Sequence, residues 1–197
     1  RTCAADASDS PGMDAPAVLA EPRVGVTPDF LCLSKGLTSG TLPLAVTMTT
    51  DAVFDAFYGD YASQRAFLHS HSYTGNPLAC AAALGTLDIF ESDNWQARNR
   101  ATAAGMWGLM SEVASHRNVI DIRQQGMILA VELAKNPRKR EPYPAEERRG
   151  LRVYRHGLAN NVLLRPLGNV VYLMPPYVID DDALVQMCKV AIDGIEA

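Results

Sequence analysis

Lys35 is the residue in this chain whose position best suits covalent chemistry. It follows a short apolar run, Phe30–Leu33, which is bounded by Pro28 and Gly36 and therefore predicts a buried strand. Open α/β sheets bind their ligands at the C-terminal ends of strands, where this lysine would lie. Burial lowers the pKa of an amine, and a neutral amine can form a Schiff base with an aldehyde. The alternative interpretation is a solvated lysine at the end of a strand.

A second polar segment, residues 70–76, leads into an alanine-rich stretch that predicts a helix. Hydroxyl groups and free backbone N–H groups at a helix N-terminus suit an anion, because that end carries partial positive charge. Ser72 is the candidate anion ligand here, and an ordinary N-cap is the alternative. His69 and His71 suggest acid–base chemistry, but Lys35 makes neither necessary, so we expect them to pack or to hydrogen-bond within the loop.

Arg165 ends an apolar run and precedes Pro166. Its guanidinium presents a rigid fork that matches a carboxylate through two parallel hydrogen bonds. A substrate carboxylate and a structural ion pair are the two interpretations of this arginine. Tyr172 and Tyr177 are close enough in sequence to line the same pocket.

Three blocks in this order resemble segments of the class III aminotransferases, a family of fold type I that uses pyridoxal phosphate. The blocks are residues 34–38 with Gly40 and Pro43-Leu44, residues 67–91, and residues 163–179. The likeness extends from about Val24 to the end of the chain. Three ordered blocks are far more specific than any one motif.

The resemblance implies roles for five residues. Lys35 would attach pyridoxal phosphate covalently and, once displaced by substrate, carry the proton between the substrate α-carbon and the cofactor. Ser72 would bind the phosphate of the neighbouring subunit's cofactor, with the backbone of His71 beside it. Ser70 aligns with a small residue near the substrate, and Arg165 aligns with the ligand of the keto acid carboxylate.

The combination of blocks points to the members of this family that act in biotin synthesis. The implied function is pyridoxal-phosphate-dependent transamination of the small molecule 8-amino-7-oxononanoate to 7,8-diaminononanoate. The amino donor in most of this group is S-adenosylmethionine, and a variant uses lysine. The resemblance further implies a cytoplasmic homodimer whose two subunits share their active sites.

The fold class that the resemblance implies is α/β, the end of the large domain plus the small C-terminal domain of fold type I. The family's ring-stacking tyrosine, Gly-Ser phosphate loop and pyridine-nitrogen aspartate precede the lysine, and none has a counterpart here. We therefore expect the C-terminal part of such an enzyme. The alternatives are an ω-amino acid transaminase of the same family, a truncated or frameshifted chain serving only as an interaction module, and a phosphate-binding domain. The last lacks the Gly-x-x-x-x-Gly-Lys-Ser/Thr spacing.

Composition excludes several other classes of protein. A chain of 197 residues with 48% hydrophobic residues can bury a sizeable core. The net charge of −4 gives no electrostatic footprint for nucleic acid, and no apolar run approaches the ~18 residues of a membrane span. The four cysteines have no metal-ligand spacing, so we expect no metal site. Cys32 and Cys80 are expected in the core of a protein from a reducing cytosol.

Periodicity and turn signals predict alternating helices and strands. We expect an irregular leader at residues 1–23, the remainder of the cofactor-binding large domain at 24–93, and the small α/β domain at 94–197. The predicted strands are residues 30–33, 44–49, 119–123, 127–133, 162–165 and 170–174. The predicted helices are residues 51–58, 76–92, about 94–116, 146–160 and 180–195.

Overall fold

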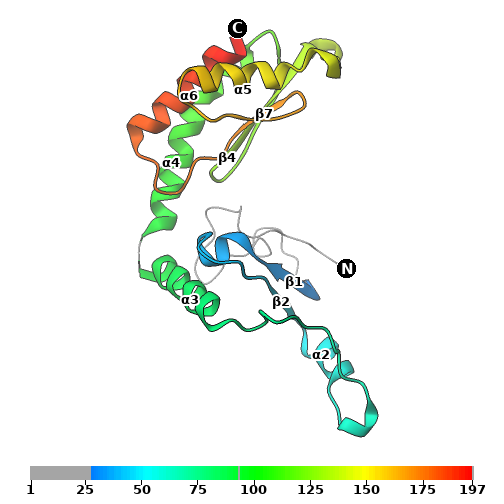
Figure 1. Ribbon diagram of the computed structural model, residues 1–197. Helices are drawn as coiled ribbons and strands as arrows, with labels where there is room; N and C mark the ends of the chain where they lie inside the picture. The colour runs from blue at the N-terminus through cyan, green and yellow to red at the C-terminus, as the bar shows by residue number, and fades with distance from the viewer. Residues whose placement is uncertain (1–27, 93, 197) are drawn as a thin grey trace. The chain divides into compact units, whose positions relative to one another are not determined.

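The computed structural model describes residues 28–92 and 94–196, and the chain divides into two compact units, residues 1–96 and 97–197 (Figure 1). The leader expected at residues 1–23 lies outside the described residues. The division follows Gln96, whereas the sequence predicts a domain boundary after residue 93. The assignment of a cofactor-binding domain and a small domain to these regions stays a prediction.

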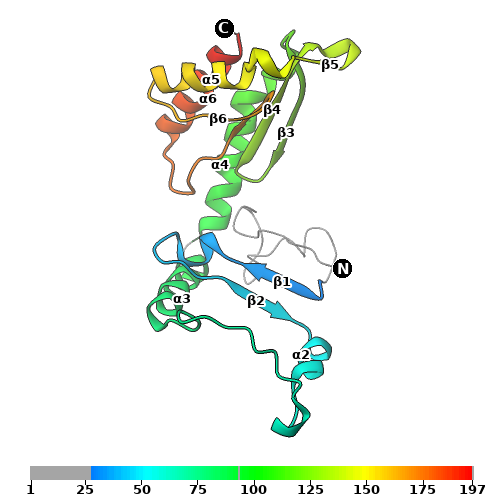
Figure 2. The same ribbon diagram turned by 45° about the vertical axis from the view of Figure 1, so that its right-hand side comes forward.

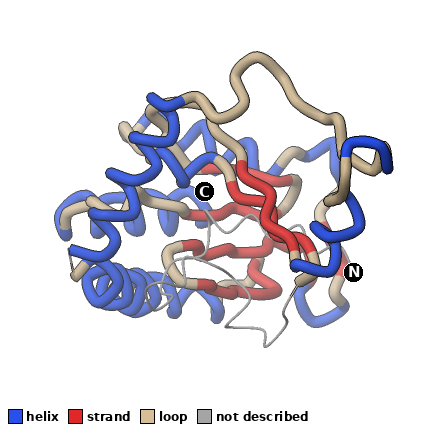
Figure 3. Tube along the Cα trace, turned by 90° about the horizontal axis from the view of Figure 1, so that it is seen from below, coloured by secondary structure: helices blue, strands red, loops and turns tan. Residues whose placement is uncertain are grey.

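The first unit contains a two-stranded sheet and a long helix. Its elements are β1 (Phe30–Leu33), the 3₁₀ helix η2 (Lys35–Thr38), β2 (Val46–Thr49), α2 (Asp51–Phe57), the 3₁₀ helix η3 (Tyr61–Ser63) and α3 (Pro77–Ser92). β1 pairs antiparallel with β2, and Leu33 lies opposite Val46 (Figure 2). Helix α3 packs against η2. Most of the connection from α2 to α3 is loop, drawn in tan in Figure 3.

The expected burial of β1 is wrong for most of its residues. Leu31 is buried, but Cys32 is exposed because successive side chains of a strand point to opposite faces. Cys80 is also exposed, since the buried stripe of α3 runs through its neighbour Ala79 and through Ala83 instead. The prediction that these two cysteines are core residues is therefore wrong.

The second unit is an antiparallel sheet with helices packed on it. Its elements are α4 (Trp95–Met110), which begins just before the division, and then η4 (Ser111–Ser115), β3 (Val119–Gln125), β4 (Ile128–Asn136), η5 (Pro137–Lys139), β5 (Glu141–Pro142), η6 (Ala145–Glu147), α5 (Arg149–Ala159), β6 (Arg165–Leu167), β7 (Val170–Leu173) and α6 (Asp181–Glu196). The strands of the sheet lie in the order β3-β4-β7-β6. Strand β5 also pairs with β4, with residues of β4 that follow those paired with β3. All of these described pairs are antiparallel.

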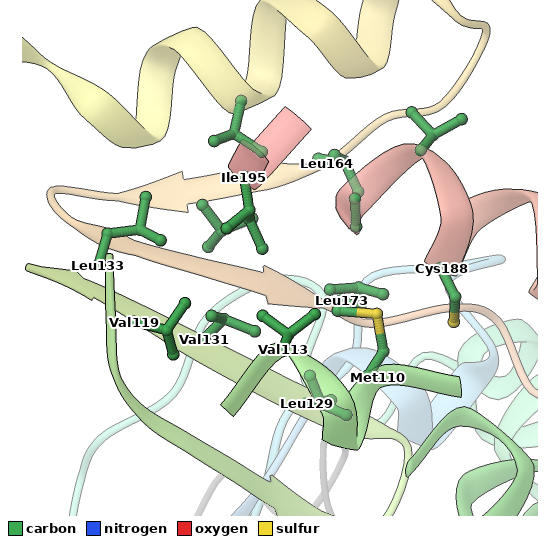
Figure 4. Close-up of a cluster of buried hydrophobic side chains, with 14 of the residues drawn as sticks. Met110, Val113, Val119, Leu129, Val131, Leu133, Leu164, Leu173, Cys188 and Ile195 are labelled. Atoms are coloured by element: carbon green, nitrogen blue, oxygen red, sulfur yellow. The ribbon is translucent and has the colours of Figure 1, made fainter. Parts of the chain in front are cut away.

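The core of the second unit lies between one face of this sheet and its helices (Figure 4). Leu129 lies opposite Leu173 and Val131 opposite Val171, so these four buried side chains share one face of β4 and β7. Helices α4, α5 and α6 cover this face with further apolar residues, namely Met106, Met110, Val153, Leu184, Cys188 and Ile195. The alternating burial of β4 follows from the two-residue period of a strand with one covered face.

Local signals mark some of the helix boundaries. Asp180 begins α6 by accepting a hydrogen bond from the Ala183 N–H at 2.7 Å. Thr50 precedes α2 without a side-chain cap bond, and Asp51 places an acidic residue in the first turn of that helix. The helix expected to reach residue 116 ends as an α-helix at Met110 and continues as the 3₁₀ helix η4. None of the described helices is long and apolar enough to cross a membrane.

Candidate active site

Lys35 lies where the chain leaves β1 and turns abruptly into η2. Its φ angle is +50°, in the left-handed region that a residue with a side chain seldom adopts, whereas Ser34 before it is extended. Such a backbone costs of the order of 1 kcal/mol and persists only where surrounding contacts hold it. Lys35 is exposed, so the described residues do not supply the desolvation expected from the sequence.

Short hydrogen bonds hold the loop that follows Lys35. Thr38 is buried and its hydroxyl donates to the Leu42 carbonyl at 2.6 Å. Thr86 on α3 donates its hydroxyl proton to the Ala82 carbonyl, so the 3.1 Å bond between Ser39 and Thr86 has Ser39 as its donor. This bond ties the loop to α3. The Gly- and Thr-rich stretch is therefore a fixed turn anchored on the helix.

Residues 71–76 form a second turn, which leads into α3. The Thr74 hydroxyl accepts from the His71 N–H at 3.1 Å, and the Thr74 N–H donates back to the His71 carbonyl at 3.0 Å. The Tyr73 N–H donates to His71 Nδ1 at 3.1 Å, which leaves the proton of a neutral His71 ring on Nε2. His71 thus organises this turn, as expected of a histidine with a loop-bonding role.

The N-terminus of α3 offers fewer donors than the sequence suggests. Pro77 has no N–H, and the Leu78 N–H donates to the Asn76 side chain at 3.0 Å. Among the described residues, in contrast, no hydrogen bond engages the hydroxyl of Ser70 or Ser72. Any anion beside this turn would therefore meet hydroxyl groups before it met helix N–H groups.

A hollow of about 790 Å³ joins the two turns. Its walls include Lys35, His71, Leu44 and Ala45, together with Tyr73 and Thr74. Lys35 and His71, which lie far apart in sequence, therefore share one hollow, whose size is within the range of small-molecule sites. Sequence reasoning missed Tyr73 and Thr74, although both belong to the polar segment that drew attention to Ser72.

The other predicted residues lie outside the walls of this hollow. Ser72 lies between two wall residues, His71 and Tyr73, and Ser70 precedes His71. Arg165 belongs to the second unit, where it begins β6 and lies opposite Tyr172. Its guanidinium carbon is 5.7 Å from the Tyr172 ring centroid, and no described carboxylate forms an ion pair with it. No cluster of three or more His, Cys, Asp or Glu side chains in the described part of the chain is placed to hold a metal.

Comparison with known proteins assigns these features to a family. The family described as aminotransferase class-III matches residues 17–194. The chain belongs to this family. It is 42% identical over 174 residues to the adenosylmethionine-8-amino-7-oxononanoate aminotransferase of Geobacter sulfurreducens, covering 88% of this chain and 38% of that enzyme. The chain thus spans well under half the length of this relative.

Solved structures of class III aminotransferases have the same fold over the shared region. The adenosylmethionine-8-amino-7-oxononanoate aminotransferase of Methanocaldococcus jannaschii is 37% identical with a TM-score of 0.82, covering 86% of this chain and 39% of that one. An amine transaminase from an uncultivated Pseudomonas species, solved with pyridoxal phosphate bound, is 29% identical with a TM-score of 0.81, covering 94% and 42%. The α/β fold class expected from the sequence is confirmed as part of the class III aminotransferase fold.

Proposed function

We propose that this chain carries the cofactor lysine of a class III aminotransferase that converts 8-amino-7-oxononanoate to 7,8-diaminononanoate in biotin biosynthesis. The observation that carries the proposal is the hollow that Lys35 shares with the His71 turn, in a chain 42% identical to a Geobacter sulfurreducens enzyme named for that substrate. S-adenosylmethionine is the proposed amino donor, with lysine as the alternative.

The residues around the hollow fit pyridoxal phosphate. The cofactor needs an amine at its aldehyde and donors at its phosphate. Lys35 supplies the amine. The Ser72 hydroxyl lies on the exposed turn that follows His71, and we assign it to the phosphate of the neighbouring subunit's cofactor. Apolar wall residues such as Leu44 suit contact with an aromatic ring. When bound, pyridoxal phosphate supplies the carbonyl that carries the amino group and the electron sink for the substrate carbon.

Each proposed site residue has a separate task. The Lys35 amine holds the cofactor and then moves the proton at the substrate carbon that bears the amino group. The fixed turn at η2 gives that amine a defined starting position. Ser72 binds the phosphate of the neighbouring subunit's cofactor through its hydroxyl, and the backbone of His71 lies beside it. Ser70 contacts the substrate, and Arg165 binds the carboxylate of the keto acid through its fork.

The whole enzyme in this proposal is a cytoplasmic homodimer with active sites shared between its subunits. The exposed position of the His71 turn supports a role toward a second copy, because residues 61–75 are all exposed within the described chain. The scattered cysteines, none of them in a disulfide among the described residues, are compatible with a reducing compartment.

A second candidate function is transamination of a simple amine or an ω-amino acid. The Pseudomonas amine transaminase, which covers 94% of this chain at 29% identity, favours this alternative. The higher identity of 42% to the Geobacter sulfurreducens enzyme favours 8-amino-7-oxononanoate. Side-by-side assays with the two classes of substrate distinguish these candidates.

The experiment places this chain in a complete enzyme. In a chimaera, the chain replaces the matching part of the Geobacter sulfurreducens relative. After incubation with pyridoxal phosphate and reduction with borohydride, peptide mapping should find the cofactor on Lys35. Lys35→Ala should abolish this labelling, and the control Lys135→Ala should retain it. A labelled peptide that contains another lysine would overturn the assignment, and activity only on simple amines would overturn the proposed substrate.

A further inference from the structure

The second unit has a hollow of its own, which is lined by none of the proposed active-site residues. It measures about 250 Å³ and lies among the segment that enters β3, the start of α5 and the end of α6. Its floor consists of the buried apolar side chains Leu133, Tyr143, Val153 and Ile195. Figure 4 shows Leu133 and Ile195 on the same side of the core, beneath α5. The lining of this hollow is therefore partly apolar and partly polar.

Three arginines surround this apolar floor, namely Arg117, Arg149 and Arg152. The guanidinium of Arg149 stacks on the Tyr143 ring at 4.4 Å and is held by Glu147, with N–O distances of 2.7 and 2.8 Å. Within residues 28–92 and 94–196, no carboxylate forms an ion pair with Arg117 or Arg152. This hollow is thus lined by one guanidinium group that is held by Glu147 and by two that have no ion-pair partner among the described residues.

The local charge favours an anion. The first turn of α5 contains no acidic residue, and arginines there lie at the positive end of the helix dipole, where a cation is unfavourable. Glu196 lines the hollow and the end of α6 contributes partial negative charge, which offsets part of this excess. Because Glu147 is engaged by Arg149, Glu196 is the carboxylate among the described lining residues that can offset the charge of Arg117 and Arg152. The arrangement leaves an excess of positive charge above an apolar floor.

We propose that this hollow binds a small organic anion, a carboxylate on an apolar body. Arg117 and Arg152 hold the carboxylate, and the body lies on Tyr143 and Val153. An inorganic phosphate would satisfy the arginines but leave the apolar floor in water, so an amphipathic carboxylate matches both parts of the site. The proposal uses only residues of the second unit and does not depend on the proposed transaminase function.

Hexanoate is a suitable probe for the 197-residue chain, with binding measured by NMR chemical-shift titration. Saturable binding with a Kd on the order of 1 mM is expected for a ligand of this size. Acetate, which lacks the apolar body, and hexanol, which lacks the charge, should each bind about tenfold more weakly or worse. Absence of saturation with hexanoate would overturn the proposal. Phosphate binding as tight as hexanoate binding would contradict the apolar part of it.

Matched substitutions test the residues. Arg117→Gln and Arg152→Gln should each weaken hexanoate binding by about tenfold, because each removes a charged hydrogen bond. Arg155→Gln removes the same charge from an exposed position of α5 outside the hollow and should change the affinity by less than about twofold. Glu196→Gln should strengthen binding. Equal weakening by Arg155→Gln would show unspecific attraction and refute the site. Both arginines are exposed, and circular dichroism verifies that each variant is folded.

Discussion

Arg165 is the residue on which the proposed substrate depends. In the chimaera, Arg165→Ala should weaken binding of 8-amino-7-oxononanoate by about tenfold or more, since a charged hydrogen bond to a carboxylate is lost. Arg165→Lys should restore little of it, because an ammonium cannot reproduce the two-pronged contact. Steady-state kinetics should show the loss mainly in the KM for the keto acid. The absorbance of bound pyridoxal phosphate should persist.

Arg155→Ala is the matched control for this substitution, because Arg155 is also an exposed arginine of the second unit. It should leave the KM unchanged. Loss of cofactor in Arg165→Ala, or a normal KM, would show that Arg165 acts structurally through its contact with Tyr172. The substrate assignment would then lose its main support.

Cys188 and Cys32 should differ in chemical reactivity. Burial raises the pKa of the Cys188 thiol to about 11. Only 1% of Cys188 is exposed, whereas Cys32 is exposed to solvent. Alkylation with iodoacetamide at about pH 8, followed by mass spectrometry, should therefore modify Cys32 and Cys80 long before Cys188. Early modification of Cys188 would show that the core of the second unit opens readily.

The Cys188 thiol should also make the free energy of unfolding depend on pH. The unfolded chain ionises Cys188 near the ordinary pKa of 9.0, while the folded chain keeps it neutral up to about 11. The stabilisation is therefore complete below about pH 9 and is lost as the pH rises through 11. In urea unfolding, the free energy of unfolding of Cys188→Val should fall less between about pH 9 and pH 11 than that of the unchanged chain. The same pH dependence in both proteins would contradict this prediction.

At the scale of elements, the contact of α5 with the β6–β7 turn should be sensitive to a single methyl group. A Cβ atom at Gly150 would collide with the Gly168 carbonyl oxygen and would lie 2.9 Å from Pro166 Cβ. Gly150→Ala should lower the free energy of unfolding by about 1–3 kcal/mol, because helix and turn must move apart. Chemical denaturation of the 197-residue chain measures this change.

Gly108→Ala on α4 is the control, because nothing lies within 4 Å of the Cβ position at Gly108. There alanine should raise the free energy of unfolding by about 0.5–1 kcal/mol through its higher helix propensity. A neutral Gly150→Ala would mean that α5 does not pack closely on the turn.

Local sequence signals predict most elements of this chain, including the β3–β4 and β6–β7 strand pairs, but not every strand boundary. The strand expected at residues 162–165 is replaced by β6 at Arg165–Leu167, because the Val162 N–H donates to the Gly157 carbonyl at 2.9 Å and closes α5. The two-residue turn at Gly168, whose φ is +60°, then places Leu167 opposite Val170. Pro166 fits because β6 is at the edge of the sheet. These features depend on contacts of the folded backbone, and the periodicity of the sequence does not predict such contacts.

The candidate site was likewise predicted only in part. Residue types at the end of β1 and before α3 pointed to Lys35 and the His71 turn, and both line one hollow. The hydrogen bond from the Leu78 N–H to the Asn76 side chain was not predicted, because such a cap bond depends on the path of the backbone. The roles of Lys35, Ser70, His71, Ser72 and Arg165 in catalysis and binding stay predictions.

At the scale of the whole molecule, the first unit exposes an unusual amount of apolar surface. Phe54, Phe57, Phe67 and Leu68 are all exposed, and Leu68 is 94% exposed. Two ring contacts join the phenylalanines of this group to their neighbours, Phe57 to Phe67 and Phe54 to Tyr58. Apolar surface of this kind in a protein is characteristic of an interface. In the proposed enzyme, we expect further protein to cover this surface.

The turnover and the ANS binding of the chain alone should differ from those of the chimaera. The 197-residue chain spans 38% of the length of its Geobacter sulfurreducens relative, and we expect about half of the cofactor contacts of a complete site to come from the part that it does not span. Positioning and electrostatic stabilisation provide most of an enzyme's rate, so the chain alone should transaminate at least about 10³-fold more slowly than the chimaera. The chain should also bind the dye ANS strongly, whereas the chimaera should not, because its added protein covers Phe67 and Leu68. Comparable turnover by both proteins would show that the 197-residue chain suffices for catalysis. Equal ANS fluorescence would show that the apolar surface of the first unit faces solvent in the chimaera as well.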